Sequence, residues 1–127
     1  MDIRFEPKER VVASYMGHTV LSDIPVDAGG EDAALNPFQL MLAALGNCAG
    51  VFMKAFYRKH GLSFESAWLH QDFEFYPDGM LKKVLITVHT GKQFPKKLEK
   101  PLLANLKACK VKRHLSDTIA FEYNIVE

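Results

Sequence analysis

The sequence has little cysteine and almost no net charge. Its 127 residues include two cysteines and carry a formal charge of +1. In a reducing compartment two cysteines are a poor basis for a structural disulfide, so a disulfide between Cys48 and Cys109 would be transient. The alternative is that both are small buried hydrophobic residues. The near-neutral balance, and a basic stretch at residues 92–113 that is poor in aromatic residues, predict no nucleic-acid partner.

Motifs for metal, phosphate and serine chemistry are also absent. The five histidines lack the i,i+4 spacing and the C-x-x-C partners that typify metal sites. The chain has no glycine-rich phosphate loop, no serine nucleophile elbow and no paired-carboxylate motif. We therefore expect neither a metal nor another cofactor.

No long apolar run is uninterrupted. The most hydrophobic segment is broken by Gln39, Asn47 and Lys54, well short of the about 18 consecutive apolar residues expected of a transmembrane helix. The first ten residues, MDIRFEPKER, contain no apolar core segment and do not resemble a signal peptide. These absences predict a cytoplasmic protein with no membrane partner.

What is present is typical of one folded domain. The chain is 48% hydrophobic and 24% charged, and its length predicts a single domain over residues 1–127. Residues 1–50 are acidic, whereas residues 92–113 are basic. This asymmetry would suit two faces that meet in a dimer.

Residues 36–61 predict one long helix. Asn36 is a good N-cap, Pro37 suits the first helical position, and Gln39 stands where a capping box places Glu or Gln. Gly61 is a typical residue just beyond a helix C-terminus. Apolar residues surround this helix almost completely, so we expect it to be buried in protein.

Gly46 and Gly50 lie four residues apart on that helix. Two glycines at this spacing let another backbone approach closely. The approaching element is either the same helix of a second subunit or the protein's own sheet.

Period-2 patterns and turn residues predict strands before and after the long helix. A second amphipathic helix is expected at residues 96–109, where Pro101 either begins the true helix or kinks it. A further turn is expected at residues 111–115. The predicted strands are residues 2–6, 10–15, 18–24, 67–76, 81–89 and 118–126. Residues 26–35 are expected to form an exposed loop, and the fold class is α+β.

Two motifs in this arrangement resemble the OsmC/Ohr family, the osmotically inducible and organic-hydroperoxide-resistance proteins. The first is NPFQL at residues 36–40 with AALGNC at residues 43–48, similar to the family's N/S-P-x-E/Q-L…A-x-G-x-C helix. The second is CKV at residues 109–111 with Leu115, similar to the family's C-P-V…L. The resemblance runs from about Arg10 to the C-terminus.

The resemblance implies a fold, an assembly and an activity. Antiparallel sheets would wrap around the long central helix in an intertwined homodimer, with the two cysteines at the subunit interface. The implied activity is thiol-dependent reduction of organic hydroperoxides, with Cys48 as the peroxidatic cysteine and Cys109 as the resolving cysteine. An external dithiol would be the reductant. Phe38, Met41 and Phe52 would line a pocket for a small apolar hydroperoxide.

The sequence also departs from the family pattern. Hydroperoxidase members carry a glutamate that holds an arginine over the reactive thiol, and Phe38 stands at that position. Arg10 is our candidate for the arginine and Arg4 the second choice, although each also fits a solvated strand residue. Lys110 replaces the family's proline, and the basic residues that follow Cys109 either lower its pKa or cover a surface turn.

Two functions are therefore open. In the first, Cys48, Cys109 and Arg10 reduce hydroperoxides in an oxidative stress response. In the second, an OsmC-like dimer with inert thiols binds a small molecule or has an uncharacterised stress-related role.

Overall fold

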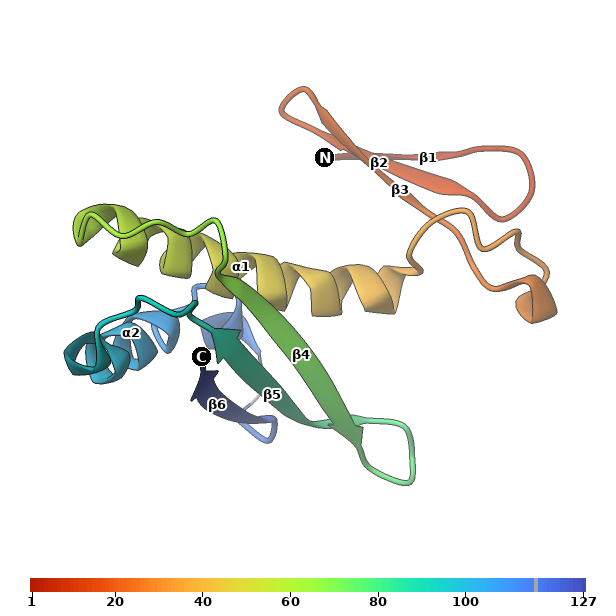
Figure 1. The fold of residues 1–127 in the computed structure, drawn as a ribbon. Helices are drawn as coiled ribbons and strands as arrows, with labels where there is room; N and C mark the ends of the chain where they lie inside the picture. Colours follow the sequence, from red (N-terminus) through yellow and green to blue (C-terminus); the bar gives the residue numbers. More distant parts are fainter. Residues whose placement is uncertain (116) are drawn as a thin grey trace. The chain divides into compact units, whose positions relative to one another are not determined.

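Three short strands at the start of the chain form an antiparallel sheet (Figure 1). In the computed structural model, which describes residues 1–115 and 117–127, these are β1 (Asp2–Phe5), β2 (Val11–Tyr15) and β3 (His18–Ser22). They pair in chain order, β2 in the centre. Gly17 has a φ of 80° in the turn between β2 and β3, where glycine is favoured. The three strands predicted in this part of the chain are confirmed.

The loop after β3 is organised by a buried aspartate. Asp23 is 1% exposed, and its carboxylate accepts hydrogen bonds from the backbone N–H groups of Ile24 at 2.8 Å, Ala33 at 3.0 Å and Glu31 at 3.2 Å. The pKa of Asp23 is lowered, mainly by the bond from Ala33. The loop also contains the short 3-10 helix η1 (Val26–Ala28). It is exposed, as expected, but the aspartate that anchors it was not predicted.

The long helix α1 (Pro37–Lys59) begins and ends where the sequence predicts. Gln39 N–H donates to Asn36 Oδ1 at 2.9 Å, and Asn36 N–H donates to Gln39 Oε1 at 3.0 Å. This reciprocal pair is the predicted capping box. Gly61, with a φ of 64°, takes the left-handed conformation beyond the last turn.

Only one face of α1 is buried within the chain. The buried stripe repeats every three or four residues, at Leu42, Leu45, Ala49, Met53, Phe56 and Tyr57. Val51, on another face, is 67% exposed. The expectation that the whole helix is covered is therefore not met by this chain alone. By length and composition α1 also qualifies as a membrane span, a test that core helices of soluble proteins pass as well.

The two glycines of α1 face strand β4 (Trp68–Phe75). A Cβ atom at Gly46 would lie 2.5 Å from Gln71 Nε2, and one at Gly50 would lie 4.0 Å from Leu69 Cδ1. The close approach at Gly46 is thus to the protein's own sheet, the second of the two alternatives above.

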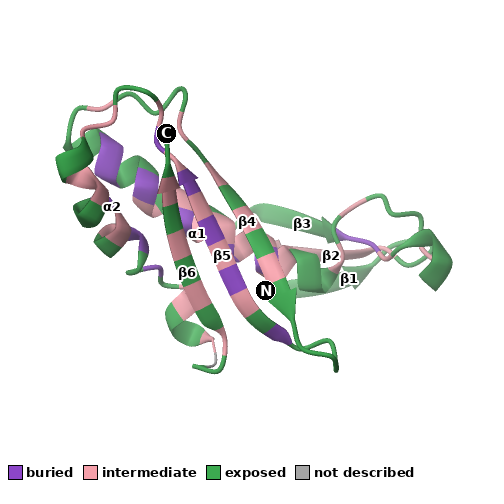
Figure 2. Cartoon of the chain, turned by 60° about the horizontal axis from the view of Figure 1, so that its bottom comes forward, coloured by how far each residue is buried: buried purple, intermediate pink, exposed green. Residues whose placement is uncertain are grey.

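The second sheet has the strand order β4-β5-β6, with β5 (Leu81–His89) between β4 and β6 (Ala120–Val126). Strands β4 and β5 form the predicted antiparallel hairpin. Burial alternates along β5, as Figure 2 shows. Ile86 of β5 lies between Gln71 of β4 and Tyr123 of β6. One face of the sheet therefore carries alternate residues of all three strands.

Strand β6 corrects one detail of the predicted fold. It pairs with β5 in the parallel direction, whereas only antiparallel sheets were expected. A parallel neighbour requires a crossover connection of a dozen or more residues. The segment between β5 and β6 supplies it, through η2 (Lys96–Leu98), α2 (Glu99–Leu106) and η3 (Lys112–His114).

Helix α2 confirms the predicted second helix in a shorter form. Pro101 lies in its first turn, where no N–H donor is needed, and does not kink it. Leu102 and Leu106 are fully buried. The chain divides into two compact units, Met1–Ala43 and Ala44–Glu127, and the division falls inside α1. The single domain over residues 1–127 stays a prediction.

Candidate functional site

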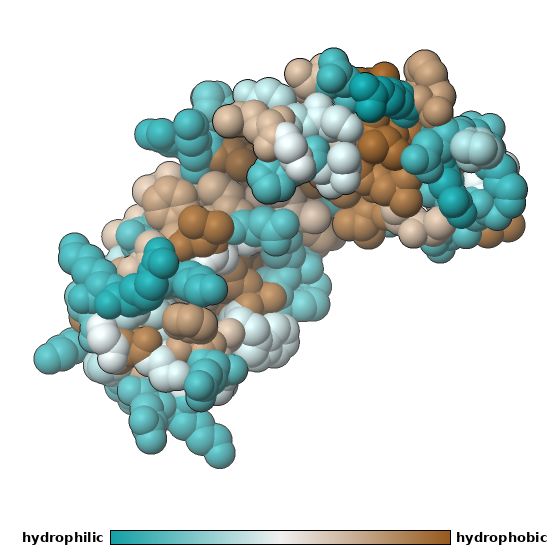
Figure 3. Space-filling view, turned by 90° about the horizontal axis from the view of Figure 1, so that it is seen from above, coloured by the Kyte–Doolittle hydropathy of each residue, from teal (hydrophilic) through white to brown (hydrophobic). Residues whose placement is uncertain are grey.

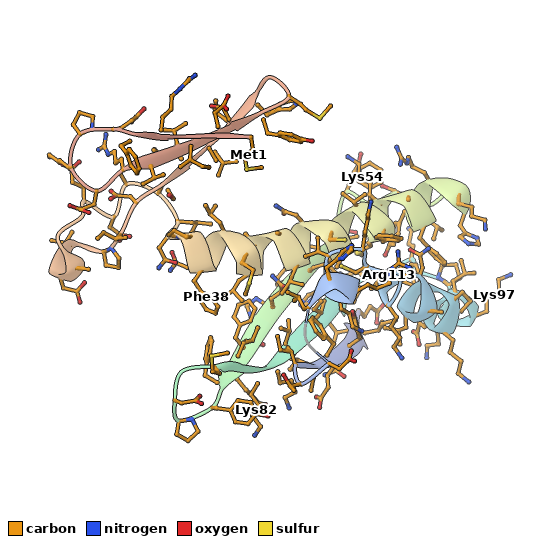
Figure 4. The ribbon with its side chains drawn as sticks, turned by 180° about the vertical axis from the view of Figure 1, so that it is seen from behind. Met1, Phe38, Lys54, Lys82, Lys97 and Arg113 are labelled. Carbon is orange, nitrogen blue, oxygen red and sulfur yellow. The ribbon has the colours of Figure 1, made fainter. Side chains whose placement is uncertain are left out.

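The two cysteines come from different helical segments of the second unit and meet there. Cys48 lies midway along α1 and is partly exposed, whereas Cys109 follows α2 and is 2% exposed. Both are free thiols, and the thiol of Cys109 hydrogen-bonds to the sulfur of Cys48. Figure 4 shows η3, which carries Arg113, against the middle of α1. The fold thus brings together two residues 61 positions apart in the sequence.

Backbone N–H groups surround the sulfur of Cys48. Burial raises the pKa of this thiol, but hydrogen bonds from Cys109 and from the backbone N–H groups of Val111 and Lys110 lower it. The sum leaves the pKa of Cys48 below its ordinary value. Donors aimed at a thiolate favour the charged form, which is the nucleophilic form of cysteine.

The pKa of Cys109 moves in the opposite direction. Burial raises it, and so does the hydrogen bond that its thiol donates to Cys48. The backbone N–H of Lys112, which donates to Cys109 Sγ at 3.4 Å, offsets only part of this rise. The side-chain charges of the basic residues after Cys109 therefore do not lower its pKa, contrary to the first of the two alternatives above, and only backbone N–H groups of the turn do. The lowered pKa of Cys48 and the raised pKa of Cys109 make Cys48 the more acidic of the two thiols.

Strand β6 adds a tyrosine and a phenylalanine close to the cysteine pair. Burial, followed by the negative charges of Cys109 and Cys48, raises the pKa of Tyr123 to about 12. The Lys112 ammonium lies 4.8 Å from the centre of the Phe121 ring and 5.4 Å from that of the Tyr123 ring. The sequence analysis did not single out Tyr123 as a site residue.

Arg10 lies in the first unit and is held by a carboxylate. Its guanidinium Nη2 lies 2.7 Å from Glu31 Oε2, and Lys8 pairs with the same side chain. The pKa of Glu31 is lowered, mainly by the hydrogen bond from Lys8. Arg4, the second choice, lies in the exposed strand β1. Arg10 and Cys48 belong to different units, and the role of Arg10 at Cys48 stays a prediction.

Sequence reasoning found the two cysteines through the motifs around them. It missed the donors at Cys48, because a backbone N–H carries no sequence signature. One signal was available: Lys110 stands where the family has proline, and unlike proline it has an N–H to donate. It also missed Glu31, because the glutamate was sought at position 38 of α1 and lies in the loop before the helix.

A second feature of this unit is a cavity of about 780 Å³ beyond the C-terminal end of α1. Trp68 and His89 stack along its wall, with ring centres 3.7 Å apart. Tyr57 also lines the cavity, and its hydroxyl donates to the backbone oxygen of Thr90 at 2.9 Å. The cysteines are not among the residues that line it.

Metal-binding geometry is absent from the described part of the chain. Within residues 1–115 and 117–127, no three His, Cys, Asp or Glu side chains are grouped so that they could hold a metal ion.

Comparison with known proteins identifies one family. A family model described as OsmC-like protein matches residues 29–124. No curated protein matches the chain.

Many solved structures share the fold, at low sequence identity. A Psychrobacter arcticus 273-4 protein assigned to the osmotic stress induced and detoxification response has a TM-score of 0.84 at 17% identity, covering 98% of this chain and 93% of its own. An organic hydroperoxide resistance protein from Legionella pneumophila gives 0.61 at 17% identity, with coverages of 98% and 99%. The organic hydroperoxide resistance protein OhrB of Bacillus subtilis gives 0.63 at 15% identity, with coverages of 98% and 95%.

Proposed function

Because the chain belongs to the OsmC-like protein family, we propose that it is a thiol-dependent peroxidase that reduces organic hydroperoxides. The observation that carries this proposal is the cysteine pair, in which the pKa of Cys48 is lowered and its sulfur is hydrogen-bonded to the thiol of Cys109. The names of the Legionella and Bacillus proteins of the same fold, which refer to organic hydroperoxide resistance, support the proposed substrate class.

In the first step the Cys48 thiolate attacks the terminal oxygen of the hydroperoxide. The O–O bond breaks, Cys48 becomes a sulfenic acid, and an alkoxide leaves. Cys109, whose thiol is hydrogen-bonded to Cys48, protonates the alkoxide to give the alcohol.

In the second step the Cys109 thiolate attacks the sulfur of the Cys48 sulfenic acid. A disulfide forms, and hydroxide leaves as water after it takes up the proton that Cys48 first released. An external dithiol then reduces the disulfide by thiol–disulfide exchange. The buried position of Cys109, beside the reacting sulfur, favours this closure over further oxidation of Cys48.

Arg10 is proposed to stabilise the reacting oxygens, with Glu31 in place of the glutamate that is absent at position 38. The ion pair to Glu31 would hold the guanidinium in one orientation. Phe38, Met41 and Phe52 remain our proposal for an apolar substrate pocket.

A homodimer is part of the proposal, because the first sheet exposes many apolar side chains. Phe5 is 86% exposed and shares one face of the sheet with Ile3 and Val20, and exposed apolar faces of this kind mark interaction sites. Hydrophobic surface of the chain appears brown in Figure 3. The exposed apolar residues of this sheet and its turns are Ile3, Phe5, Tyr15, Met16, Val20 and Leu21. Light scattering after size exclusion is expected to give twice the mass of one chain.

Thiol titration before and after one equivalent of cumene hydroperoxide tests the function. We expect the loss of both thiols of each chain. Cys48→Ser should abolish the loss, whereas Cys109→Ser should leave a sulfenic acid that dimedone traps. If the unsubstituted protein keeps both thiols after peroxide addition, the proposal is refuted.

A second candidate is binding of a small molecule, which the cavity beside Trp68 favours. Trp68 is the single tryptophan of the chain, so its fluorescence reports directly on this cavity. A ligand that quenches Trp68 in protein with inert thiols would favour this function over peroxide reduction.

A further inference from the structure

Lys112 connects the turn at the cysteines with strand β6. Its backbone N–H donates to Cys109 Sγ at 3.4 Å, while its side-chain ammonium lies over the rings of Phe121 and Tyr123. The two rings occupy alternate positions of β6, so they lie on the same face of the sheet. A single residue therefore contacts both the reactive centre and the sheet next to it.

We propose that Lys112 is a positioning residue for the Cys48 thiolate. Its ammonium, attracted by the two aromatic rings, fixes the turn so that the N–H groups of Lys110 and Val111 point at the Cys48 sulfur. The inference rests on the proposed function, since it matters for catalysis only if the Cys48 thiolate reacts. Lys112 acts through the turn that carries these donors.

Within its described residues, the turn is held by short-range backbone hydrogen bonds and by the three-residue helix η3, and 3-10 segments of this length have weak hydrogen-bond geometry. The contact of Lys112 with β6 adds a long-range restraint. The charges of both cysteines contribute to the raised pKa of Tyr123, so the rings that contact Lys112 lie near the cysteine pair to which the N–H groups donate. A restraint at this point acts directly on the donors.

The competing explanation is that the Lys112 charge stabilises the thiolate through space. The charge of Cys48 acts on Cys109 and on Tyr123, and two further basic residues, Lys110 and Arg113, lie within two positions of Lys112 in the sequence. The two explanations differ in whether the rings of Phe121 and Tyr123 are needed. Positioning of the turn through the cation–ring contacts, called the clamp below, requires the rings, whereas a charge acting through space does not.

The test measures the thiolate fraction of Cys48 from its ultraviolet absorbance and its rate of alkylation by iodoacetamide. A Cys109→Ser background leaves one thiol and keeps a hydroxyl donor. Lys112→Met removes the charge but keeps an unbranched apolar side chain, and Lys112→Arg keeps a cation that stacks on aromatic rings. A double variant, Phe121→Leu with Tyr123→Leu, removes the rings and keeps Lys112.

Lys112→Met and the double ring variant are each expected to lower the thiolate fraction at neutral pH by about three- to fivefold. Lys112→Arg should retain it. No change in Lys112→Met, or a change in Lys112→Met without one in the ring variant, would overturn the clamp. Circular dichroism checks that each variant is folded.

If the ring variant does not fold, the Lys112→Met and Lys112→Arg proteins decide the question at low and high salt. Contact between a cation and the rings persists in salt, whereas a charge acting across solvent is screened. An effect of Lys112→Met that disappears in high salt would refute the clamp. No peroxide is used, so a failed clamp and a missing peroxidase activity are separate results.

Discussion

The backbone N–H of Lys110 is a donor that one substitution can remove. Lys110→Pro deletes the N–H that donates to Cys48, because proline has none. Lys110→Ala keeps this N–H and removes only the ammonium. The two variants therefore separate a backbone effect from a side-chain charge at the same position.

The expected size of the effect of Lys110→Pro on the Cys48 thiolate follows from the hydrogen bond that is lost. A hydrogen bond to a charged group contributes about 1.5–3 kcal/mol. Cys48 is partly exposed, so solvent screening places the loss near the lower end of that range. Since about 1.4 kcal/mol corresponds to a factor of ten, Lys110→Pro should lower the thiolate fraction at neutral pH about tenfold. Lys110→Ala should change it by less than about twofold.

The assay is the alkylation rate of Cys48 as a function of pH, in a Cys109→Ser background. The rate profile of Lys110→Pro should shift to higher pH, because its thiol keeps its proton longer. If Lys110→Pro and Lys110→Ala shift equally, the backbone donor has no role and the side-chain charge explains the effect. If neither variant shifts, Lys110 does not stabilise the thiolate.

Three further predictions concern the fold. Gly50→Ala should raise the free energy of unfolding by about 0.8–1 kcal/mol, because alanine favours helix and its Cβ has room. Gly46→Ala should raise it by less, because its Cβ meets the side chain of Gln71. Equal gains for the two variants in thermal denaturation would contradict this. The lowered pKa of Asp23 means that its carboxylate stabilises the fold above its ordinary pKa of 3.8, and that this stability is lost as the pH falls through the lower folded value. Asp23→Asn should therefore flatten the dependence of unfolding free energy on acid pH, and an unchanged slope would refute the assignment. Leu106→Ala should lower the free energy of unfolding by about 2–5 kcal/mol in urea titration, since Leu106 is fully buried. A loss below about 1 kcal/mol would contradict this and would mean that the surrounding side chains fill the space left by the leucine.

The ends of α1 were predictable because the signals are local. Asn36 and Gln39 bond to each other across one helical turn, and Gly61 adopts its left-handed conformation within the next few residues after the helix. The strands of the three hairpins, β1–β2, β2–β3 and β4–β5, were predictable for the same reason. Each depends on alternation and on turn residues a few positions away.

The direction of β6 was not predictable in this way. The alternation in residues 118–126 predicts a strand, but it is the same for parallel and antiparallel neighbours. The direction depends on the path of the chain from β5 through α2, which is a property of the whole unit. Burial of α1 on one face was missed for a similar reason, since an apolar sequence does not show which face this chain covers.

The candidate site shows the same difference between features with a local sequence signal and features that depend on tertiary packing. Cys48 and Cys109 could be found from motifs, whereas the groups that distinguish their acidities are backbone donors and a buried environment created by tertiary packing. The departures from the family pattern then acquire a physical meaning. Lys110 in place of proline adds an N–H at the sulfur of Cys48, and Glu31 provides Arg10 with a carboxylate although position 38 is phenylalanine.

These two departures bear differently on reactivity. An N–H fixed in the backbone stabilises a thiolate without a mobile side chain, so it acts whether or not a substrate is present. An arginine acts only when it lies beside the reacting oxygens, and its ion pair with Glu31 orients it in either case. If Lys110→Pro slows alkylation of Cys48 and Arg10→Lys slows only the reaction with hydroperoxide, the backbone donors prepare the nucleophile and Arg10 acts on the substrate. Equal effects of Arg10→Lys on both reactions would instead place Arg10 among the groups that set the pKa of Cys48.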